Sequence, residues 1–281
     1  MKTILVPVDF SENCLSALNA AKLIARKTKA KIYLLHAYFP YVPTEISVPV
    51  SLDIYRDVEE SMKDSLKSYV EEARAEGLEA EAIWTEGKVL TAVMQYAENL
   101  NADLVVIGRT GSGGFLDKLF GSVATDIVKE LESTPVLTIP PGAVLERIDK
   151  MVYATRLEND ENVAIRKVAA IAGDLGAQLQ FMKLNSLTQT DIQPDEQFIQ
   201  PIKEEFGFTD EDFVLVDIGR HSIVEEIEKQ ALNLKADILV VSTKEKGFLE
   251  ELLVDPSVSK KLVLNTSTPL LTCRLEGYSY S

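Results

Sequence analysis

The sequence is poor in cysteine and in positive charge, and it contains no long apolar run. Of its 281 residues only Cys14 and Cys273 are cysteines, and both stand outside any Cys-x-x-Cys or Cys/His spacing. Neither a disulfide framework nor a zinc site can therefore be read from them, and small core residues are the simpler interpretation. The longest apolar runs, such as residues 104–107 and 238–241, fall far short of the roughly 20 residues that a membrane-spanning helix needs. No membrane span is predicted.

Acidic residues outnumber basic ones. Lys and Arg number 29 against 44 Asp and Glu, which gives a formal net charge of -15 at pH 7. Such a surface repels phosphate-rich polymers, so nonspecific nucleic-acid binding is disfavoured. The apolar stretch Ile4–Val8 ends at Asp9 and lacks the length and the cleavage site of a secretory signal, so a cytoplasmic protein is expected.

The chain contains an internal sequence repeat. Three segments of the first half recur in the second, namely residues 2–9, 101–107 and 133–137 as residues 149–156, 235–241 and 267–271. The last two pairs share an offset of 134 residues, which is too long for a solenoid and indicates two domains. The breaker cluster Pro140-Pro141-Gly142 indicates a linker, so we predict domains at residues 1–142 and 143–281.

Within the first half, short apolar runs alternate with longer helical periods, which is typical of a parallel α/β sheet. We predict strands at residues 3–8, 31–37, 79–85, 103–107 and 136–139. Helices are predicted between them at residues 11–27, 58–76, 89–99 and 122–132. Residues 39–52, with three prolines, are expected to form a loop, and the second half repeats the plan with a polar, irregular middle.

A glycine-rich segment follows the fourth predicted strand. Gly108, Arg109 and Gly111 come directly after it, and nine residues separate Gly111 from the pair Gly121-Ser122, which is predicted to open the next helix. Glycine lets the backbone approach a phosphate, and a helix N-terminus offers free amides and a positive dipole, to which Val123 would add an amide. The spacing matches neither the P-loop nor the dinucleotide fingerprint. A glycine turn without a ligand is the alternative.

The pattern Gly108-x-x-Gly111, nine residues, Gly121-Ser122 resembles the ATP-binding signature of the universal stress protein family. Residues 4–11 (ILVPVDFS) resemble that family's first strand and turn, and the repeat is similar to its tandem subclass. The resemblance covers essentially the whole chain. It implies an α/β fold of two tandem Rossmann-like (adenine nucleotide alpha hydrolase-like) domains, each an open five-stranded parallel sheet with helices on both faces.

The resemblance also implies how a nucleotide would be held. Adenosine would lie across the ends of the first, second and fourth strands, on Pro7, Val8, Asp9, Ala37 and Gly108. The phosphates would lie on Arg109, Gly111, Gly121, Ser122 and Val123. A divalent ion such as Mg would be carried mainly by the phosphates, so no protein metal ligand is expected.

Three side chains near this site have an alternative interpretation. Asp9 could accept hydrogen bonds from ribose or adenine, or it could cap the helix near Ser11. Arg109 is either a mobile cation beside the phosphates or a solvated surface residue. His36 resembles a catalytic base, but a lone His inside a strand is more often a satisfied core residue. No Ser/His/Asp ordering or paired carboxylates converge on the loop, so no catalytic residue is assigned and at most slow ATP hydrolysis is expected.

The second half departs from the signature. Ser242 stands where the first glycine of the signature stands, and Arg156 aligns with Asp9. Glu245 and Asp255 enter the corresponding loop, where each would repel a phosphate by roughly 1 kcal/mol at about 4 Å in water. We therefore predict that the second half binds no ATP and has a pairing and regulatory role.

The sequence is compatible with two functions. The preferred one is an ATP-binding stress-response protein whose occupied state is read by an unidentified protein partner. The alternative is a nucleotide-independent interaction module whose acidic surface serves a partner. Residues 270–273 are predicted to pack against residues 136–139, giving an intramolecular pseudo-dimer, and a homodimer of such chains is equally compatible with the sequence.

Overall fold

The computed structural model describes residues 1–39, 52–109, 117–131, 133–155, 162–186, 196–218, 223–243 and 266–274. In the first half the elements are β1 (Thr3–Pro7), α1 (Glu12–Thr28), β2 (Lys31–Tyr38), α2 (Leu52–Ala75), β3 (Ala80–Glu86), α3 (Val89–Asn99), β4 (Leu104–Gly108), α4 (Asp117–Glu130) and β5 (Val136–Ile139). In the second half they are β6 (Lys150–Thr155), α5 (Asn162–Leu175), β7 (Gln178–Ser186), α6 (Glu196–Phe206), the 3-10 turn η2 (Asp210–Asp212), β8 (Phe213–Ile218), α7 (Ile223–Asn233), β9 (Ile238–Thr243) and β10 (Leu270–Arg274). The α/β alternation predicted from the sequence is confirmed.

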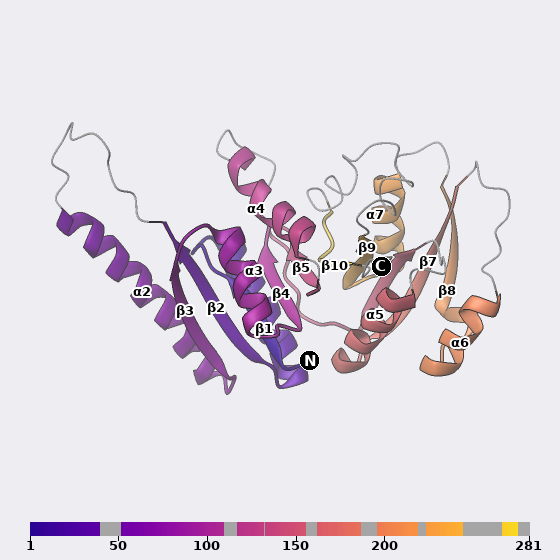
Figure 1. Ribbon diagram of the computed structural model, residues 1–281. Coiled ribbons are helices and arrows are strands. Elements are labelled where there is room, and N and C mark those ends of the chain that lie inside the picture. The colour runs from indigo at the N-terminus through magenta and orange to yellow at the C-terminus, as the bar shows by residue number, and fades with distance from the viewer. Residues whose placement is uncertain are drawn as a thin grey trace, which may run out of the picture.

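The strands form one continuous sheet in the order β3-β2-β1-β4-β5-β10-β9-β6-β7-β8 (Figure 1). Each half contributes five strands that pair in parallel, as expected. The two five-stranded sheets are joined edge to edge, because β10 pairs antiparallel with β5. Leu271 lies opposite Leu137 in this pairing, so the predicted contact between the last strands of the two halves is confirmed.

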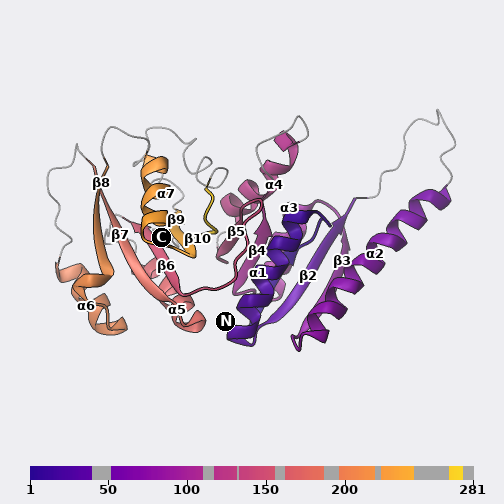
Figure 2. The same ribbon diagram turned by 180° about the vertical axis from the view of Figure 1, so that it is seen from behind.

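Helices cover both faces of the first-half sheet because its strands are apolar on both sides. Ile4 and Val6 of β1 face one core cluster, to which α1 and α2 contribute, whereas Leu5 faces the other, to which α3 and α4 contribute. Figure 1 shows α3 in front of the sheet, and the reverse view in Figure 2 shows α1 in front. The second half follows the same plan, with α5 and α6 in the first cluster and α7 in the second.

Two aspartates at equivalent positions of the two halves make equivalent hydrogen bonds. The carboxylate of Asp103 accepts hydrogen bonds from the amides of Lys2 and Thr3, at 2.6 and 2.9 Å. Asp237, 134 residues later, accepts from the amides of Asp149 and Lys150, at 2.8 and 2.9 Å. Each carboxylate therefore fixes the start of the first strand of its own half, and the sequence repeat is a structural repeat.

Helix α1 also touches the second half. The ammonium of Lys27 donates to the carbonyl oxygens of Ile148 and Leu175, at 3.1 and 2.9 Å. The amino group of Met1 pairs with the carboxylate of Asp174. Side-chain contacts thus reinforce the pairing of β5 with β10.

Two helix starts differ from the predictions. Helix α2 begins at Leu52 rather than at residue 58, and α4 begins at Asp117 rather than at Ser122. Gly121 does not interrupt α4, because one glycine inside a helix costs only about 1 kcal/mol. The predicted loop at residues 39–52 lies almost wholly outside the described residues. In the part of the chain that is described, no helix combines the length and the apolar character needed to cross a membrane.

Candidate functional site

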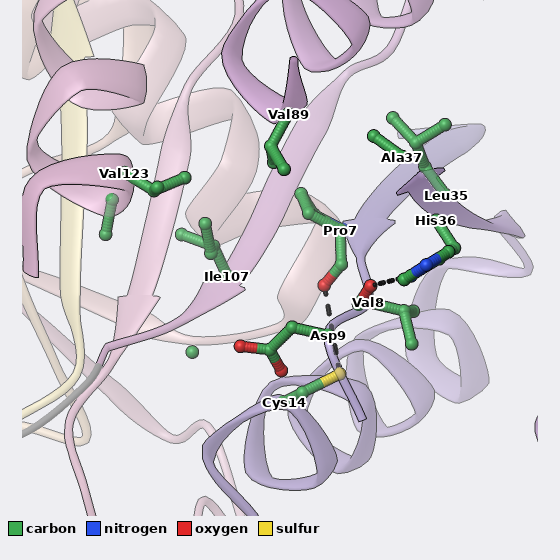
Figure 3. Close-up of a pocket in the computed structure, with 12 residues that line it drawn as sticks. Pro7, Val8, Asp9, Cys14, Leu35, His36, Ala37, Val89, Ile107 and Val123 are labelled. Atoms are coloured by element: carbon green, nitrogen blue, oxygen red, sulfur yellow. Dashed lines mark hydrogen bonds between the residues drawn. The ribbon is translucent and has the colours of Figure 1, made fainter. Parts of the chain in front are cut away.

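A pocket lies at the carboxyl ends of β1, β2 and β4 and encloses about 130 Å³ (Figure 3). It is lined by Pro7, Val8, Asp9, Cys14, Leu35, His36, Ala37, Val89, Ile107, Gly108, Val123 and Ala124. The strand order β3-β2-β1-β4-β5 reverses direction between β1 and β4. In open α/β sheets ligands bind outside the carboxyl ends of the strands at such a switch point. The pocket occupies that position.

Six of the ten residues predicted for the nucleotide site line this pocket. They are Pro7, Val8, Asp9, Ala37, Gly108 and Val123. Gly111 lies outside the described residues. Gly121 and Ser122 lie within α4, so the expectation that they open this helix is wrong. The first four amides of a helix lack an intrahelical partner, and in α4 these belong to residues 117–120.

Gly108 is required by the packing of β4 against α1. A Cβ atom built on Gly108 would lie 2.2 Å from the carbonyl oxygen of Asn13 and 3.0 Å from the amide nitrogen of Cys14. Both neighbours are backbone atoms in the first turn of α1, so they cannot move aside without moving the helix. Glycine at this position brings the start of α1 next to the pocket.

Asp9 follows β1 and binds the N-cap residue of α1, Ser11, rather than capping the helix itself. Its Oδ1 accepts hydrogen bonds from the amide and the hydroxyl of Ser11, at 3.0 and 2.6 Å. Ser11 is the N-cap of α1 and accepts from the amide of Cys14 at 3.2 Å. Within the described part of the chain Asp9 Oδ2 has no hydrogen-bond partner, so this oxygen can accept from a ligand in the pocket.

His36 is a satisfied buried histidine that also lines the pocket. Its Nδ1 lies 2.7 Å from the carbonyl oxygen of Val8 (Figure 3), and because a carbonyl can only accept, Nδ1 carries the proton. The ring centroid lies 4.8 Å from that of Phe10 and 4.8 Å from that of Trp84. These contacts fix the imidazole from both sides.

Arg109 is buried, so it is neither the mobile cation nor the solvated residue that the sequence suggested. Its side chain is 6% exposed, and Nη2 donates to the carbonyl oxygen of Thr266 at 2.7 Å. Burial lowers the pKa of the Arg109 guanidinium, and the nearby carboxylate of Glu228 opposes this shift. Arg109 is not among the residues that line the pocket.

Sequence reasoning missed several lining residues, because they are brought in by packing. Val89 and Ala124 come from α3 and α4, and Cys14 comes from the first turn of α1. Burial raises the pKa of the Cys14 thiol to about 11, so this side chain is a neutral group at pH 7. Leu35 and Ile107 stand near predicted site residues on β2 and β4, which is the one signal that could have found them.

The chemistry of the lining is mostly apolar. Asp9 and His36 are the titratable groups besides the buried thiol, and neither Lys nor Arg occurs among the described lining residues. Aliphatic walls with a few placed polar groups are typical of sites for flat organic molecules. Such a site suits a neutral heterocycle that carries hydroxyl groups.

The corresponding place in the second half has a different chemistry. Strand register puts Thr155, Lys183, Leu184 and Ser242 at the positions of Val8, His36, Ala37 and Gly108. All four are buried, and Thr155 and Ser242 are fully so. Threonine therefore replaces valine, an ammonium group replaces the imidazole, serine replaces glycine, and the larger leucine replaces alanine. Arg156, Glu245 and Asp255 lie outside the described residues.

The sequence is similar to that of known proteins of one family. The sequence model of the universal stress protein family matches residues 1–140. Universal stress protein MJ0531 of Methanocaldococcus jannaschii is 30% identical over 142 residues, which cover 49% of this chain and 81% of that protein. The universal stress protein in QAH/OAS sulfhydrylase 3'region of Thermus aquaticus is 31% identical over 144 residues, which cover 49% of this chain and 98% of that protein.

Among solved structures, a universal stress protein from Archaeoglobus fulgidus extends the similarity to both halves. It covers 97% of this chain and 96% of its own length, with a TM-score of 0.73 and 18% sequence identity. At this identity the likeness concerns the fold alone.

Proposed function

Because this chain belongs to the universal stress protein family, we propose that its first half binds ATP in the pocket at the ends of β1, β2 and β4. Binding would serve as a nucleotide sensor or regulator in a stress response, with slow or no hydrolysis. The observation that carries the proposal is the meeting of five predicted adenosine contacts, Pro7, Val8, Asp9, Ala37 and Gly108, in one pocket at the switch point of the sheet.

The polar groups of the pocket fit a nucleoside. The adenine ring would lie among the aliphatic side chains, such as Val89 and Ile107. Asp9 Oδ2 would accept a hydrogen bond from ribose while Oδ1 stays with Ser11. The phosphates would extend toward the N-terminus of α4, where free amides and the helix dipole favour negative charge. Mg would be held by the phosphates and would neutralise part of their charge.

Slow or absent ATP hydrolysis agrees with the hydrogen bonds that the polar side chains of the pocket already make. Among the described residues that line the pocket, His36 Nδ1 is engaged by the carbonyl of Val8 and Asp9 Oδ1 is engaged by Ser11. Neither arrangement resembles a base that a third group orients toward a nucleophile. We assign no catalytic residue.

The matched variants Ala37→Leu and Ala82→Leu test the proposal. Ala37 lines the pocket, and Leu184 stands at its position in the second half, so leucine is compatible with the strand. Ala82 is exposed on β3 and controls for the added bulk. Titration calorimetry with ATP and Mg should show at least about tenfold weaker binding for Ala37→Leu and unchanged binding for Ala82→Leu. Equal affinity in all three proteins would contradict the proposed site.

The stoichiometry of ATP bound to the parent chain tests the prediction for the second half. Protein purified without added nucleotide is denatured, and released adenine nucleotide is counted by chromatography and mass. About one ATP per chain is expected. Two per chain would show that Glu245 and Asp255 do not prevent binding.

A second candidate function is a nucleotide-independent interaction module. It is favoured because three residues of the predicted nucleotide site have structural roles that need no ligand. Gly108 is required by α1 whether or not a phosphate binds, and Asp9 and Arg109 both have partners within the protein. In that case ATP and the variant Ser122→Ala would leave the capture of a protein partner unchanged. An ATP-dependent change in capture would exclude it.

A further inference from the structure

The side chain of Arg109 crosses from the first half of the molecule to the second. Its own amide donates to the carbonyl oxygen of Ile139 at 2.8 Å, which continues the pairing of β4 with β5. Its guanidinium reaches past β5 to the carbonyl oxygen of Thr266, 157 residues away along the chain. Thr266 is 1% exposed, so this hydrogen bond is shielded from water.

The segment that receives this hydrogen bond is held from a second side by α7. The amide and the hydroxyl of Ser267 both donate to Oε1 of Glu228 at 2.8 Å. The hydroxyl of Thr266 donates to the carbonyl oxygen of Thr268 at 3.2 Å. Residues 266–268, which lead directly into β10, are thus fixed between a cation of the first half and a carboxylate of the second.

Arg109 is also next to the pocket along the chain. Gly108 lines the pocket, and Arg109 is the first residue after β4. A ligand that shifts the end of β4 must move the backbone of Arg109, because the two residues share a peptide bond. The guanidinium is buried and held at Thr266, because moving away from this carbonyl would cost a hydrogen bond made by a charged group.

We infer that Arg109 is a positioning residue between the two halves: it holds residues 266–268 against the end of β4 and thereby passes occupancy of the first-half pocket to β10 and α7. The second part of this inference rests on the proposed function, whereas the holding contact is a property of the protein without nucleotide. The guanidinium would then contribute to the arrangement of the second half rather than to phosphate binding.

Hydrogen exchange read by mass spectrometry tests both parts. The variants are Arg109→Met, which removes the donors and keeps an apolar stem, and Arg56→Met, a control at an exposed arginine of α2. Without nucleotide, exchange over residues 266–274 should be at least about tenfold faster in Arg109→Met than in the parent or the control, as expected for the loss of a charged hydrogen bond. Unchanged exchange there would overturn the holding contact.

The same proteins are then measured with ATP and Mg. In the parent, ATP should slow exchange around the pocket and over residues 266–274. In Arg109→Met it should slow exchange around the pocket alone, with an affinity within about threefold of the parent. The inference would be overturned if Arg109→Met bound ATP more than about tenfold more weakly than the parent while exchange at residues 266–274 stayed as in the parent. Arg109 would then be a phosphate ligand.

Two further outcomes are separable. If the parent binds no ATP, the proposed function and the transmission both fail, while exchange without nucleotide still decides the holding contact. If Arg109→Met does not fold, Arg109→Lys and Glu228→Gln replace it, because the first weakens the contact with Thr266 and the second the contact with Ser267, and both contacts hold the same segment. Each should speed exchange over residues 266–274, and parent-like exchange in both would overturn the inference.

Discussion

Thr138 and Thr272 stand 134 residues apart and make the same hydrogen bond in opposite directions. The hydroxyl of Thr138 donates to the carbonyl oxygen of Leu270 at 3.2 Å, and that of Thr272 donates to the carbonyl oxygen of Val136 at 3.2 Å. Leu270 and Val136 are also 134 residues apart. The junction of the halves therefore has a local twofold symmetry, although the residues at the two strand-end sites differ.

This symmetry predicts equal effects for Thr138→Val and Thr272→Val. Both hydroxyls are buried, and valine keeps the shape of the side chain while it removes the donor. Each variant should lower the free energy of unfolding by about 1 kcal/mol. Urea denaturation followed by circular dichroism measures the change. A strong effect of one variant with none of the other would show that the two contacts are not equivalent in energy.

Gly108→Ala should destabilise the protein by about 1–3 kcal/mol, because its Cβ would overlap the carbonyl of Asn13 and push α1 away. Gly173→Ala is the matched control. Gly173 is exposed in α5, and a Cβ there meets no atom within 4 Å, so alanine should stabilise the helix by up to about 1 kcal/mol. Thermal unfolding of both variants measures the difference, and a neutral Gly108→Ala would refute the packing argument.

Glu76 should stabilise the protein at neutral pH and not in acid. Lys22, 2% exposed, and Arg26 hold the pKa of the Glu76 carboxyl below its ordinary value of 4.5. A lowered folded-state pKa gives stability that is present above the ordinary value and is lost as pH falls through the lowered one. At pH 7 Glu76→Gln should cost about 1–2 kcal/mol, with Glu72 still paired to Lys22.

Urea denaturation of the parent and Glu76→Gln at a series of pH values checks this. The gap between the two proteins should be constant from pH 7 to about pH 5 and should close in stronger acid. A gap that stays open in acid would assign the effect to packing instead.

Both thiols should be inert in the folded protein. Burial raises the pKa of Cys14 to about 11 and that of Cys273 to about 12, so the reactive thiolate is a small fraction at pH 8. A chromogenic disulfide reagent should react with two thiols per chain in guanidinium and with almost none in buffer. Fast reaction of one thiol in buffer would show that its site opens readily, and Cys14→Ala would identify which one.

The strands of the first half could be predicted from the sequence. Residues 104–107 and 136–139 are short, mostly apolar runs, the second of them flanked by prolines, and both lie in strands as expected. The start of α4 could not be predicted in this way, because Gly121 looks like a helix breaker and the cost of one glycine is small enough for the rest of the helix to offset. The joining of the two sheets was predictable because the repeat itself placed residues 136 and 270 at equivalent positions.

Most of the correctly predicted pocket residues lie at strand ends, and Val123 of α4 is the exception. Pro7, Asp9 and Gly108 reach the pocket because the carboxyl ends of neighbouring parallel strands share one edge. Arg109 was not predictable, because its partner Thr266 is brought near by the pairing of β5 with β10. No local pattern around residue 109 carries that information.

The segment between the halves is exposed to solvent along most of its length. Val144 within this segment is 77% exposed. The two halves are also held together noncovalently, by the pairing of β5 with β10 and by the contacts of Lys27 and Met1 with the second half. A protease that cuts at Val144 would leave two fragments that remain associated, and two separately synthesised fragments would reassemble. The peptide bond there acts mainly as a tether that keeps the effective concentration of each half high around the other.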